Sequence, residues 1–237
     1  MSKKTSFRKS FGLFSLACLW ILGLRWIGFE PFVIPSGSMI PTLLINDHIV
    51  VSKYTYGIRL PFSNIWLKKP RVPNRGDIVV FQSTEKEDYY LIKRVVGLPG
   101  DRVQFTDSGE LIINGETAPR KKAENLNHWN ETDLGDKLAN FDLYNEKLGE
   151  RTHEVLLEKK GFRYAEPGHI VPPGKIFLMG DSRDRSRDSR FWGDLPLENL
   201  WGKAQYVWLS CEKTLSNVNF ICDPKTIRWN RFFHKID

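Results

Sequence analysis

The sequence predicts a mostly β protein, built on an antiparallel sheet and preceded by one membrane-spanning helix. Three observations lead to this prediction. After residue 32, the apolar residues come in short runs separated by Gly, Pro, Asn and Asp, which is typical of strands and turns. Residues 11–29 form one long apolar run. The composition, with 41% hydrophobic and 27% charged residues, is that of a globular chain and excludes wholesale disorder or a polytopic membrane protein.

The helix is expected over residues 11–29, because about 19 residues at ~1.5 Å per residue cover the roughly 30 Å of a bilayer core. Arg25 lies one turn from its end, where its side chain can reach the lipid headgroups, and Trp20 and Trp26 suit the interface. Residues 1–10 are basic, so the positive-inside rule places them in the cytoplasm and everything after the helix outside. A cleaved signal sequence is the alternative, although no Ala-x-Ala site follows the run.

The formal net charge of +7 is concentrated near the two ends of the chain. This distribution favours an anionic lipid surface over nucleic acid, because the sequence has no zinc-finger spacing, RNP motif or basic helix with heptads. Aromatic residues of the C-terminal part are candidates for an apolar rim that rests on the bilayer: Trp192, Trp201, Trp229, Phe232 and Phe233.

Residues 30–118 and 169–237 are expected to form the two parts of the β core. Asn114-Gly115 predicts a type I′ hairpin turn, and Asp107-Ser108-Gly109 predicts another turn. The strands are expected at His48–Lys53, Asp77–Phe81, Tyr90–Val96, Arg102–Phe105, Leu111–Ile113, Lys175–Met179 and Ala204–Leu209.

Residues 119–168 are charged and poor in β-branched residues, which indicates an insertion or cap between the two parts of the core. Within it, Leu134, Leu138, Phe141 and Leu148 recur at helix-like spacing and predict a helix over residues 133–147.

The chain has three cysteines. Cys18 lies in the apolar run, whereas Cys211 and Cys222 lie eleven residues apart in the exported part. An oxidising compartment allows a bridge between these two, but two separate thiols remain the alternative, because sequence does not give the Cα separation.

Several kinds of catalytic site have no support in the sequence. HExxH, a CxxC pair and GxSxG are all missing, and His153-Glu154 lacks a second histidine four residues on, so no metal site is expected.

Residues 34–43 stand out, because two serines flank a glycine between two prolines, and this can hold Ser38 with its hydroxyl exposed. A serine needs a base. Lys93 is the candidate, because strand alternation places it on the face of Leu91 and Val95, where burial lowers the pKa of an amine.

Four sequence motifs, in this order behind the apolar run, closely resemble those of bacterial type I signal (leader) peptidases. They are Ser36-Gly-Ser-Met-x-Pro-Thr-Leu43, Arg75-Gly-Asp-Ile-Val-Val-Phe81, Lys93-Arg94 followed by Gly97-Leu-Pro-Gly-Asp101, and Gly180-Asp-x-Arg-Asp-x-Ser-x-Asp-Ser-Arg190. The resemblance implies an antiparallel β catalytic core of signal-peptidase type. Ser182 and Arg185 depart from the family, which usually has Asn at both positions.

The resemblance also implies roles for individual residues. Ser38 is the expected nucleophile, Lys93 the general base, Ser36 an oxyanion-hole hydroxyl, and Ser186 the hydroxyl that orients the lysine. Structural support is expected from Asp181, Asp188 and Arg190. Two shallow pockets that select small substrate residues are expected to be lined by Phe32, Ile34, Pro35, Met39, Leu43, Ile49, Leu91 and Ile92.

These roles imply an enzyme of the inner (cytoplasmic) membrane, with its catalytic domain outside, that cleaves preproteins after Ala-x-Ala and works near the secretion translocon. No cofactor, metal or nucleic acid is expected. Two alternatives from other classes stay open at this point. One is a sortase-like cysteine transpeptidase that uses Cys211, and the other is an exported β-rich binding module without catalysis. A self-cleaving Ser-Lys repressor is disfavoured, because no pair of DNA-binding helices is present.

Overall fold

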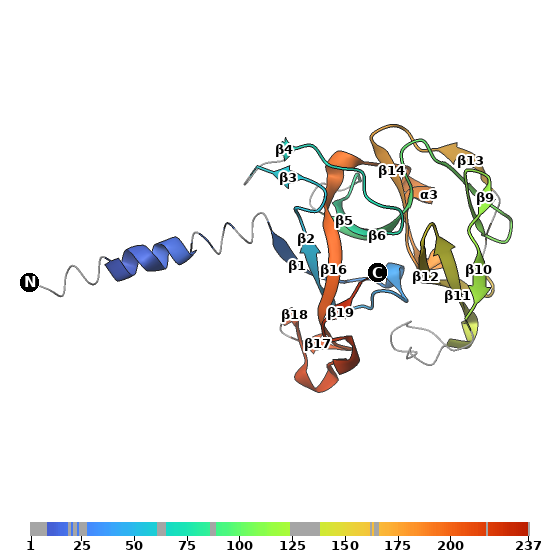
Figure 1. Ribbon diagram of the computed structural model, residues 1–237. Helices are drawn as coiled ribbons and strands as arrows, with labels where there is room; N and C mark the ends of the chain where they lie inside the picture. The colour runs from blue at the N-terminus through green and yellow to red at the C-terminus, as the bar shows by residue number, and fades with distance from the viewer. Residues whose placement is uncertain are drawn as a thin grey trace, which may run out of the picture.

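The fold is known from a computed structural model. It describes residues 9–18, 20, 23, 28–60, 65–85, 89–123, 138–161, 163, 166–216 and 218–236. Figure 1 shows a β body through which the long strand β16 runs. The described residues are mostly β, and every pairing between named strands is antiparallel.

The largest sheet has the strand order β1-β2-β16-β5-β6-β14-β15, and β19 also pairs with β16. Its strands are β1 (Phe29–Val33), β2 (Asp47–Ser52), β5 (Ile78–Gln82), β6 (Tyr90–Gly97), β14 (Lys175–Met179), β15 (Leu195–Pro196), β16 (Leu200–Ser210) and β19 (His234–Lys235). Strands from the beginning, middle and end of the chain therefore lie next to one another in this sheet.

Smaller sheets surround the large one. A three-stranded sheet has the order β10-β11-β12, and a four-stranded sheet has the order β13-β7-β8-β9. Figure 1 places β10–β12 beyond β14, on the side away from β1 and β2. Their strands are β7 (Arg102–Phe105), β8 (Leu111–Ile113), β9 (Glu116–Thr117), β10 (Arg120–Lys122), β11 (Phe141–Leu148), β12 (Arg151–Glu158) and β13 (Glu166–Ile170). The two pairs β3–β4 and β17–β18 comprise Ile58–Arg59, Trp66–Lys68, Thr214–Leu215 and Val218–Cys222.

Short helical turns connect the strands. Among the described residues from 28 to 236, the one α-helix is α3 (Ser189–Trp192). The 3-10 turns are η1 (Gly37–Met39), η2 (Leu138–Asn140), η3 (Arg183–Arg185), η4 (Leu197–Asn199), η5 (Pro224–Thr226) and η6 (Trp229–Arg231).

The large sheet is covered on both faces. Along β5, Ile78 and Val80 pack into one apolar cluster, whereas Val79 and Phe81 pack into another. Because successive side chains of a strand point to opposite faces, a strand covered on both sides is apolar throughout. In β6 this burial extends to two charged residues, Lys93 and Arg94, which are 3% and 1% exposed.

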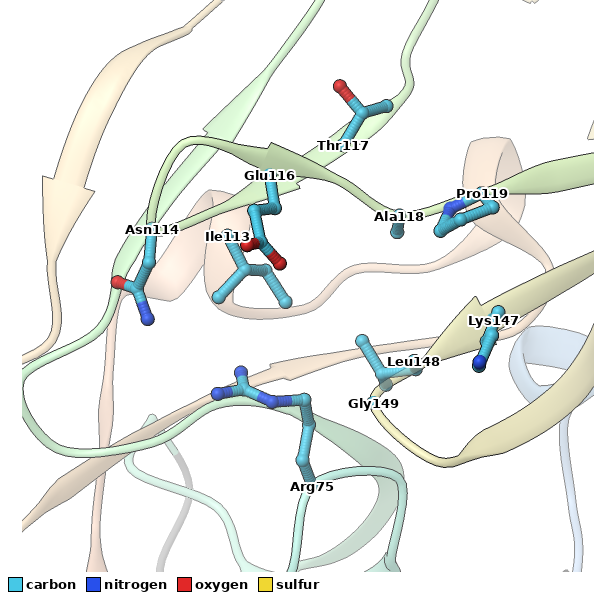
Figure 2. Close-up of a pocket in the computed structure, with 10 residues that line it drawn as sticks. All are labelled: Arg75, Ile113, Asn114, Glu116, Thr117, Ala118, Pro119, Lys147, Leu148 and Gly149. Atoms are coloured by element: carbon cyan, nitrogen blue, oxygen red, sulfur yellow. The ribbon is translucent and has the colours of Figure 1, made fainter.

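Most of the expected strands are present within one or two residues of their predicted bounds. The Asn114-Gly115 turn is also confirmed, because both residues have positive φ (54° and 87°) and join β8 to β9. A hollow of about 510 Å³ lies between this hairpin and the end of β11, and Figure 2 shows the side chains of Arg75 and Glu116 directed into it.

The helix predicted over residues 133–147 is wrong where it can be compared, because β11 begins at Phe141 and pairs with β12 along its length. Phe141 and Leu143 are buried in alternation with less buried neighbours, which is the period of a strand. Burial then moves to the opposite face, with the carboxylate Glu146 and with Leu148, so the apolar alternation was interrupted in the sequence. Residues 131–137 lie outside the described residues.

Residues 9–18 are helical, but much of the predicted span, including residues 24–27, lies outside the described residues. Over the part of the chain that is described, no helix is long and apolar enough to cross a membrane. Phe29, the last residue of the predicted span, belongs to β1 and pairs with Ser52.

Candidate active site

The segment that carries Ser38 is held as a tight turn above the sheet. The amide of Ile34 donates to the carbonyl of Asp47, and the amide of Asn46 donates back to the carbonyl of Ile34, so both ends of the segment are fixed. Between them, Gly37–Met39 form the 3-10 turn η1. Met39 is fully buried beneath this turn, whereas Ser38 is only partly buried. The buried Met39 therefore anchors the turn that presents the neighbouring hydroxyl.

Lys93 comes to this turn from β6, far away in the sequence. Its Nζ lies 2.7 Å from the Oγ of Ser38 and 2.9 Å from the carbonyl oxygen of Ile92. The side chain is 3% exposed, and this burial lowers the pKa of Lys93 to about 8, although Asp188 and Asp181 act in the opposite direction. About a tenth of the amine is therefore neutral at pH 7 and can accept a proton.

Ser186 lies beside the same turn. Its Oγ is buried and has no hydrogen-bond partner among the described residues. Gly180 allows this close packing, because a Cβ there would lie 2.2 Å from the Oγ of Ser186 and 2.4 Å from the carbonyl oxygen of Ser38. The structure thus brings Ser186 against the Ser38 turn, but the expected hydrogen bond to Lys93 is not formed.

The loop of residues 181–190 is fastened by Asp188 and Arg190. The Nε of Arg190 donates to Asp188 at 2.8 Å, and the Asp188 carboxylate also accepts from the amide of Gly180 at 3.0 Å. A terminal nitrogen of Arg190 donates to the carbonyl of Arg183 at 2.6 Å. This ion pair closes the loop around Ser186.

Asp181 and Arg94 form a second ion pair under the site. The Arg94 guanidinium donates to both carboxylate oxygens of Asp181, at 2.8 and 2.9 Å, and the Thr42 hydroxyl donates to the same carboxylate at 2.5 Å. Burial alone raises the pKa of Asp181, but the charge of Arg94 outweighs it, so this pKa lies below its ordinary value. The carboxylate is therefore ionised at neutral pH.

Sequence reasoning missed a neighbouring buried cluster. Glu146 on β11 receives a two-point ion pair from Arg183, which belongs to the loop of residues 181–190. His153 on β12 lies 3.5 Å from Glu146, and burial, followed by the charge of Arg94, lowers the pKa of His153 to about 4. Arg183 stood within a motif, but nothing in the sequence pointed to Glu146, and His153 was considered only as a metal ligand. Strand pairing alone brings these two residues together.

Most residues expected to line the substrate pockets share one apolar cluster. Leu91 instead packs against the cluster of Val79 and Phe81, and Pro35 is exposed and belongs to neither cluster. The residues in the shared cluster are Phe32, Ile34, Met39, Leu43, Ile49 and Ile92.

A hollow of about 370 Å³ opens over Ser38 and Lys93. It is lined by Ser36, Gly37, Ser38, Ile40, Ile45, Leu91, Lys93, Leu156, Ser182, Arg185 and Arg187. A nucleophile, a base with a lowered pKa and a space for a substrate are thus in one place, which is the arrangement needed for acyl transfer.

The described residues also bear on the cysteine transpeptidase that the sequence left open. Cys211 is bonded to Cys222, with their Cα atoms 5.7 Å apart, so Cys211 offers no thiolate for a transpeptidase. The bridge left open by the sequence is therefore present. Within the described ranges, no group of three or more His, Cys, Asp or Glu side chains is placed to hold a metal ion.

Comparison with known proteins gives a consistent family. Residues 7–209 match a family model described as signal peptidase, peptidase S26. Signal peptidase I of Pseudomonas fluorescens is 44% identical, over 80% of this chain and 68% of that protein. Signal peptidase I of Rickettsia typhi is 34% identical, over 97% of this chain and 94% of that protein. A crystal structure of a signal peptidase I from Enterococcus faecalis covers 55% of this chain and 95% of that chain, at 24% identity and a TM-score of 0.32.

Proposed function

The chain belongs to the signal peptidase family, peptidase S26, and from this premise we propose that Ser38 and Lys93 are its catalytic dyad. It is a serine endopeptidase of the signal peptidase I type, which removes signal peptides from preproteins. The observation that carries the dyad is the 2.7 Å contact between the Nζ of Lys93 and the Oγ of Ser38, made by an amine that is 3% exposed.

Acylation begins when neutral Lys93 removes the proton from Ser38. The Ser38 oxygen attacks the scissile carbonyl, and the resulting ammonium of Lys93 then protonates the leaving amine as the peptide bond breaks. The mature chain departs with a free N-terminus, and the signal peptide stays attached to Ser38 as an ester. In the second half, Lys93 takes a proton from a water molecule, which hydrolyses the ester and restores both residues.

The negative charge that forms on the carbonyl oxygen needs donors. We assign this role to the amide of Ser38 and the hydroxyl of Ser36, which lie on either side of Gly37 in the same turn. Ser36 precedes the turn with extended backbone (φ −140°, ψ 157°) and is exposed, so its hydroxyl is accessible to a substrate. Donors already held in position require little reorganisation during the reaction.

Ser186 is proposed to orient the lysine. An ammonium has three donors, and two of those on Lys93 are already directed to Ser38 and to the carbonyl of Ile92. The unsatisfied Oγ of Ser186 is a buried acceptor packed against the Ser38 turn, and we assign it as the partner of the third donor. With three partners, the lone pair of the neutral amine has a defined direction toward Ser38.

Cleavage after Ala-x-Ala is proposed from the apolar cluster next to the dyad. Ile34, Met39, Leu43 and Ile49 are each no more than 2% exposed, so the floor on this side is well filled. A filled floor accepts small side chains and excludes large ones. The substrate would add as an extended strand between residues 34–36 and β6.

Anchoring in the inner membrane is proposed from the apolar run of residues 11–29 and the basic residues before it. Of the five aromatic residues expected at the rim, Trp229, Phe232 and Phe233 are 70%, 47% and 67% exposed, which suits contact with lipid. Trp192 and Trp201 are instead partly buried against apolar clusters of the body, and Trp201 also donates to Glu30 at 2.7 Å.

The dyad is tested with the purified full chain and a preprotein that carries Ala at the last and third-last positions of its signal peptide. Ser38→Ala and Lys93→Met should each abolish release of the mature product, whereas the exposed controls Ser108→Ala and Lys121→Met should leave it unchanged. Release by either dyad variant at the parent rate would contradict the proposal. Circular dichroism of all four variants separates loss of chemistry from loss of fold.

The rim is tested by co-sedimentation with vesicles that contain anionic lipid. Trp229→Ala combined with Phe232→Ala should weaken partitioning of a chain that begins at residue 28, and Ile170→Ala, at an equally exposed position of β13, should not. Equal partitioning of all three proteins would reject the contact.

A further inference from the structure

The turn that carries Ser38 separates two apolar floors. Met39 packs with Ile34 in the cluster beneath β1 and β2, whereas the next residue, Ile40, packs with Leu156 in a cluster that the β11–β12 hairpin supplies. In the proposed function, the signal peptide lies over the first floor, the cluster that contains Met39 and Ile34. A substrate joined to Ser38 at its scissile carbonyl then runs over the second floor with the residues that follow the cleavage site.

The hollow over the dyad extends toward this second floor. Its lining includes Ile40, Ile45 and Leu156, but none of the buried residues Met39, Leu43 and Ile49 of the first floor. On its far side the hollow is bounded by the loop of residues 181–190. This loop is fixed to the floor, because the amide of Leu156 donates to the carbonyl of Asp181 and the amide of Ser182 donates to the carbonyl of Ser38.

Two arginines of this loop, Arg185 and Arg187, line the hollow, and none of its lining residues is acidic. Arg185 is held in place, because its guanidinium lies 4.6 Å above the ring of Phe141 and its Nε donates to Glu158 at 2.5 Å. Arg187 pairs with Glu85 at 2.7 Å, but both side chains of this pair are well exposed, at 71% and 48%. Neither glutamate belongs to the lining.

We propose that this hollow binds the first residues of the mature chain and favours an acidic side chain within about three residues after the cleavage site. The inference rests on the proposed function, because it takes the direction of the substrate from the dyad. A carboxylate there meets Arg185 directly, and Arg187 can exchange its exposed partner Glu85 for the substrate, since exposed ion pairs contribute little.

The same two charges favour release of the product. Cleavage leaves an α-amino group that is largely protonated at neutral pH, because its ordinary pKa is about 8. This new positive charge forms in a hollow lined by two guanidinium groups, so the mature chain is repelled only after the bond has broken. An acidic side chain thus helps the uncleaved chain to bind without holding the product.

The test compares peptides that differ only at the second residue after an Ala-x-Ala cleavage site, with Asp, Asn or Lys at that position. For the parent chain, kcat/KM with Asp should exceed that with Asn by about fivefold, the worth of one partly exposed ion pair. The Lys peptide should be the poorest of the three, and high salt should reduce the differences. The ratio of kcat/KM values for two peptides, measured with the same variant, does not depend on what fraction of that variant is active.

Arg187→Gln should lower the Asp-to-Asn ratio, and Arg185→Gln combined with Arg187→Gln should bring it near one. Lys147→Gln is the matched control, because it removes one positive charge at the separate hollow of Figure 2 and should keep the parent ratio. A parent ratio near one, or a fivefold ratio that survives in the double variant, would overturn the inference.

A binding measurement separates this inference from the dyad assignment. In a Ser38→Ala background the uncleaved peptides can be compared by fluorescence anisotropy, with and without the arginine substitutions. The preference for binding the Asp peptide should be largest with both arginines present, smaller in the Arg187→Gln variant and lost in the double variant. If Ser38→Ala still cleaved, the dyad would be wrong while the binding ratio would still decide the charge preference.

Discussion

The lowered pKa of Lys93 gives the most direct prediction, which concerns the effect of pH on activity. Because the base must be neutral, and burial lowers its pKa to about 8, kcat/KM should fall about tenfold for each pH unit below this value. At pH 6 about 1% of the amine is neutral, so activity should be ~100-fold below the plateau reached above pH 9. If Lys93 were hydrated and had its ordinary pKa of about 10.4, kcat/KM would not reach a plateau at pH 9 but would continue to rise toward pH 10.

The assay is the initial rate of cleavage of one Ala-x-Ala peptide, measured well below KM between pH 5.5 and 10, so that the profile reports groups of the free enzyme. His153 should not contribute, because its pKa of about 4 lies below this range. Near-ultraviolet circular dichroism at each pH excludes unfolding as the cause. An acid limb near pH 10, or a flat profile from pH 6 to 9, would refute a buried amine as the base.

Three further predictions test how the site is built. Gly180→Ala should lower kcat by about 100-fold with the fold retained, because its Cβ would displace the Ser186 hydroxyl and the Ser38 carbonyl, 2.2 and 2.4 Å away; an unchanged kcat would show that this packing does not matter. Lys93→Met should stabilise the protein by about 2 kcal/mol more at pH 7 than at pH 10, as measured by urea unfolding. The reason is that burial lowers the pKa of Lys93 in the native state, so the buried charge destabilises the parent protein fully below about pH 8 and progressively less as the pH rises toward 10.5. A pH-independent difference would contradict that sign. Cys222→Ser should lower the free energy of unfolding by about 3 kcal/mol in the same measurement, because the disulfide closes a loop between cysteines 11 residues apart and so restricts the unfolded chain. An unchanged free energy of unfolding would show that the disulfide does not restrict the unfolded chain.

Much of the fold was predictable because its strands carry their own pattern. The runs around β2, β5 and β6 are apolar and β-branched, and glycine, proline and asparagine end them. Lys93 could be singled out because a lysine within such a run must be buried. The same alternation placed Arg94 on the opposite face and gave no reason to expect it to be buried, yet it is 1% exposed. Both faces of β6 are covered, so the pattern of one strand does not show which charged residues are buried.

The parts that sequence did not predict depend on contacts between distant segments. Glu146 is buried near the end of β11 and is balanced by Arg183, which is 37 residues away in the sequence. A buried charge with its partner so far along the chain looks like an ordinary polar residue of an exposed helix. The disulfide was left open for the same reason, because a spacing of 11 residues does not fix the Cα separation of Cys211 and Cys222.

The buried ion pairs explain how a lysine can serve as the base beside two carboxylates. Asp188 and Asp181 both act to raise the pKa of Lys93, and, left unpaired, they would favour the charged form that cannot accept a proton. Each carboxylate instead carries its own arginine at 2.8 Å, Arg190 and Arg94 respectively. The two arginines therefore do more than fasten the loop. By neutralising the nearest negative charges, they leave burial as the dominant influence on Lys93 and keep its amine available to Ser38.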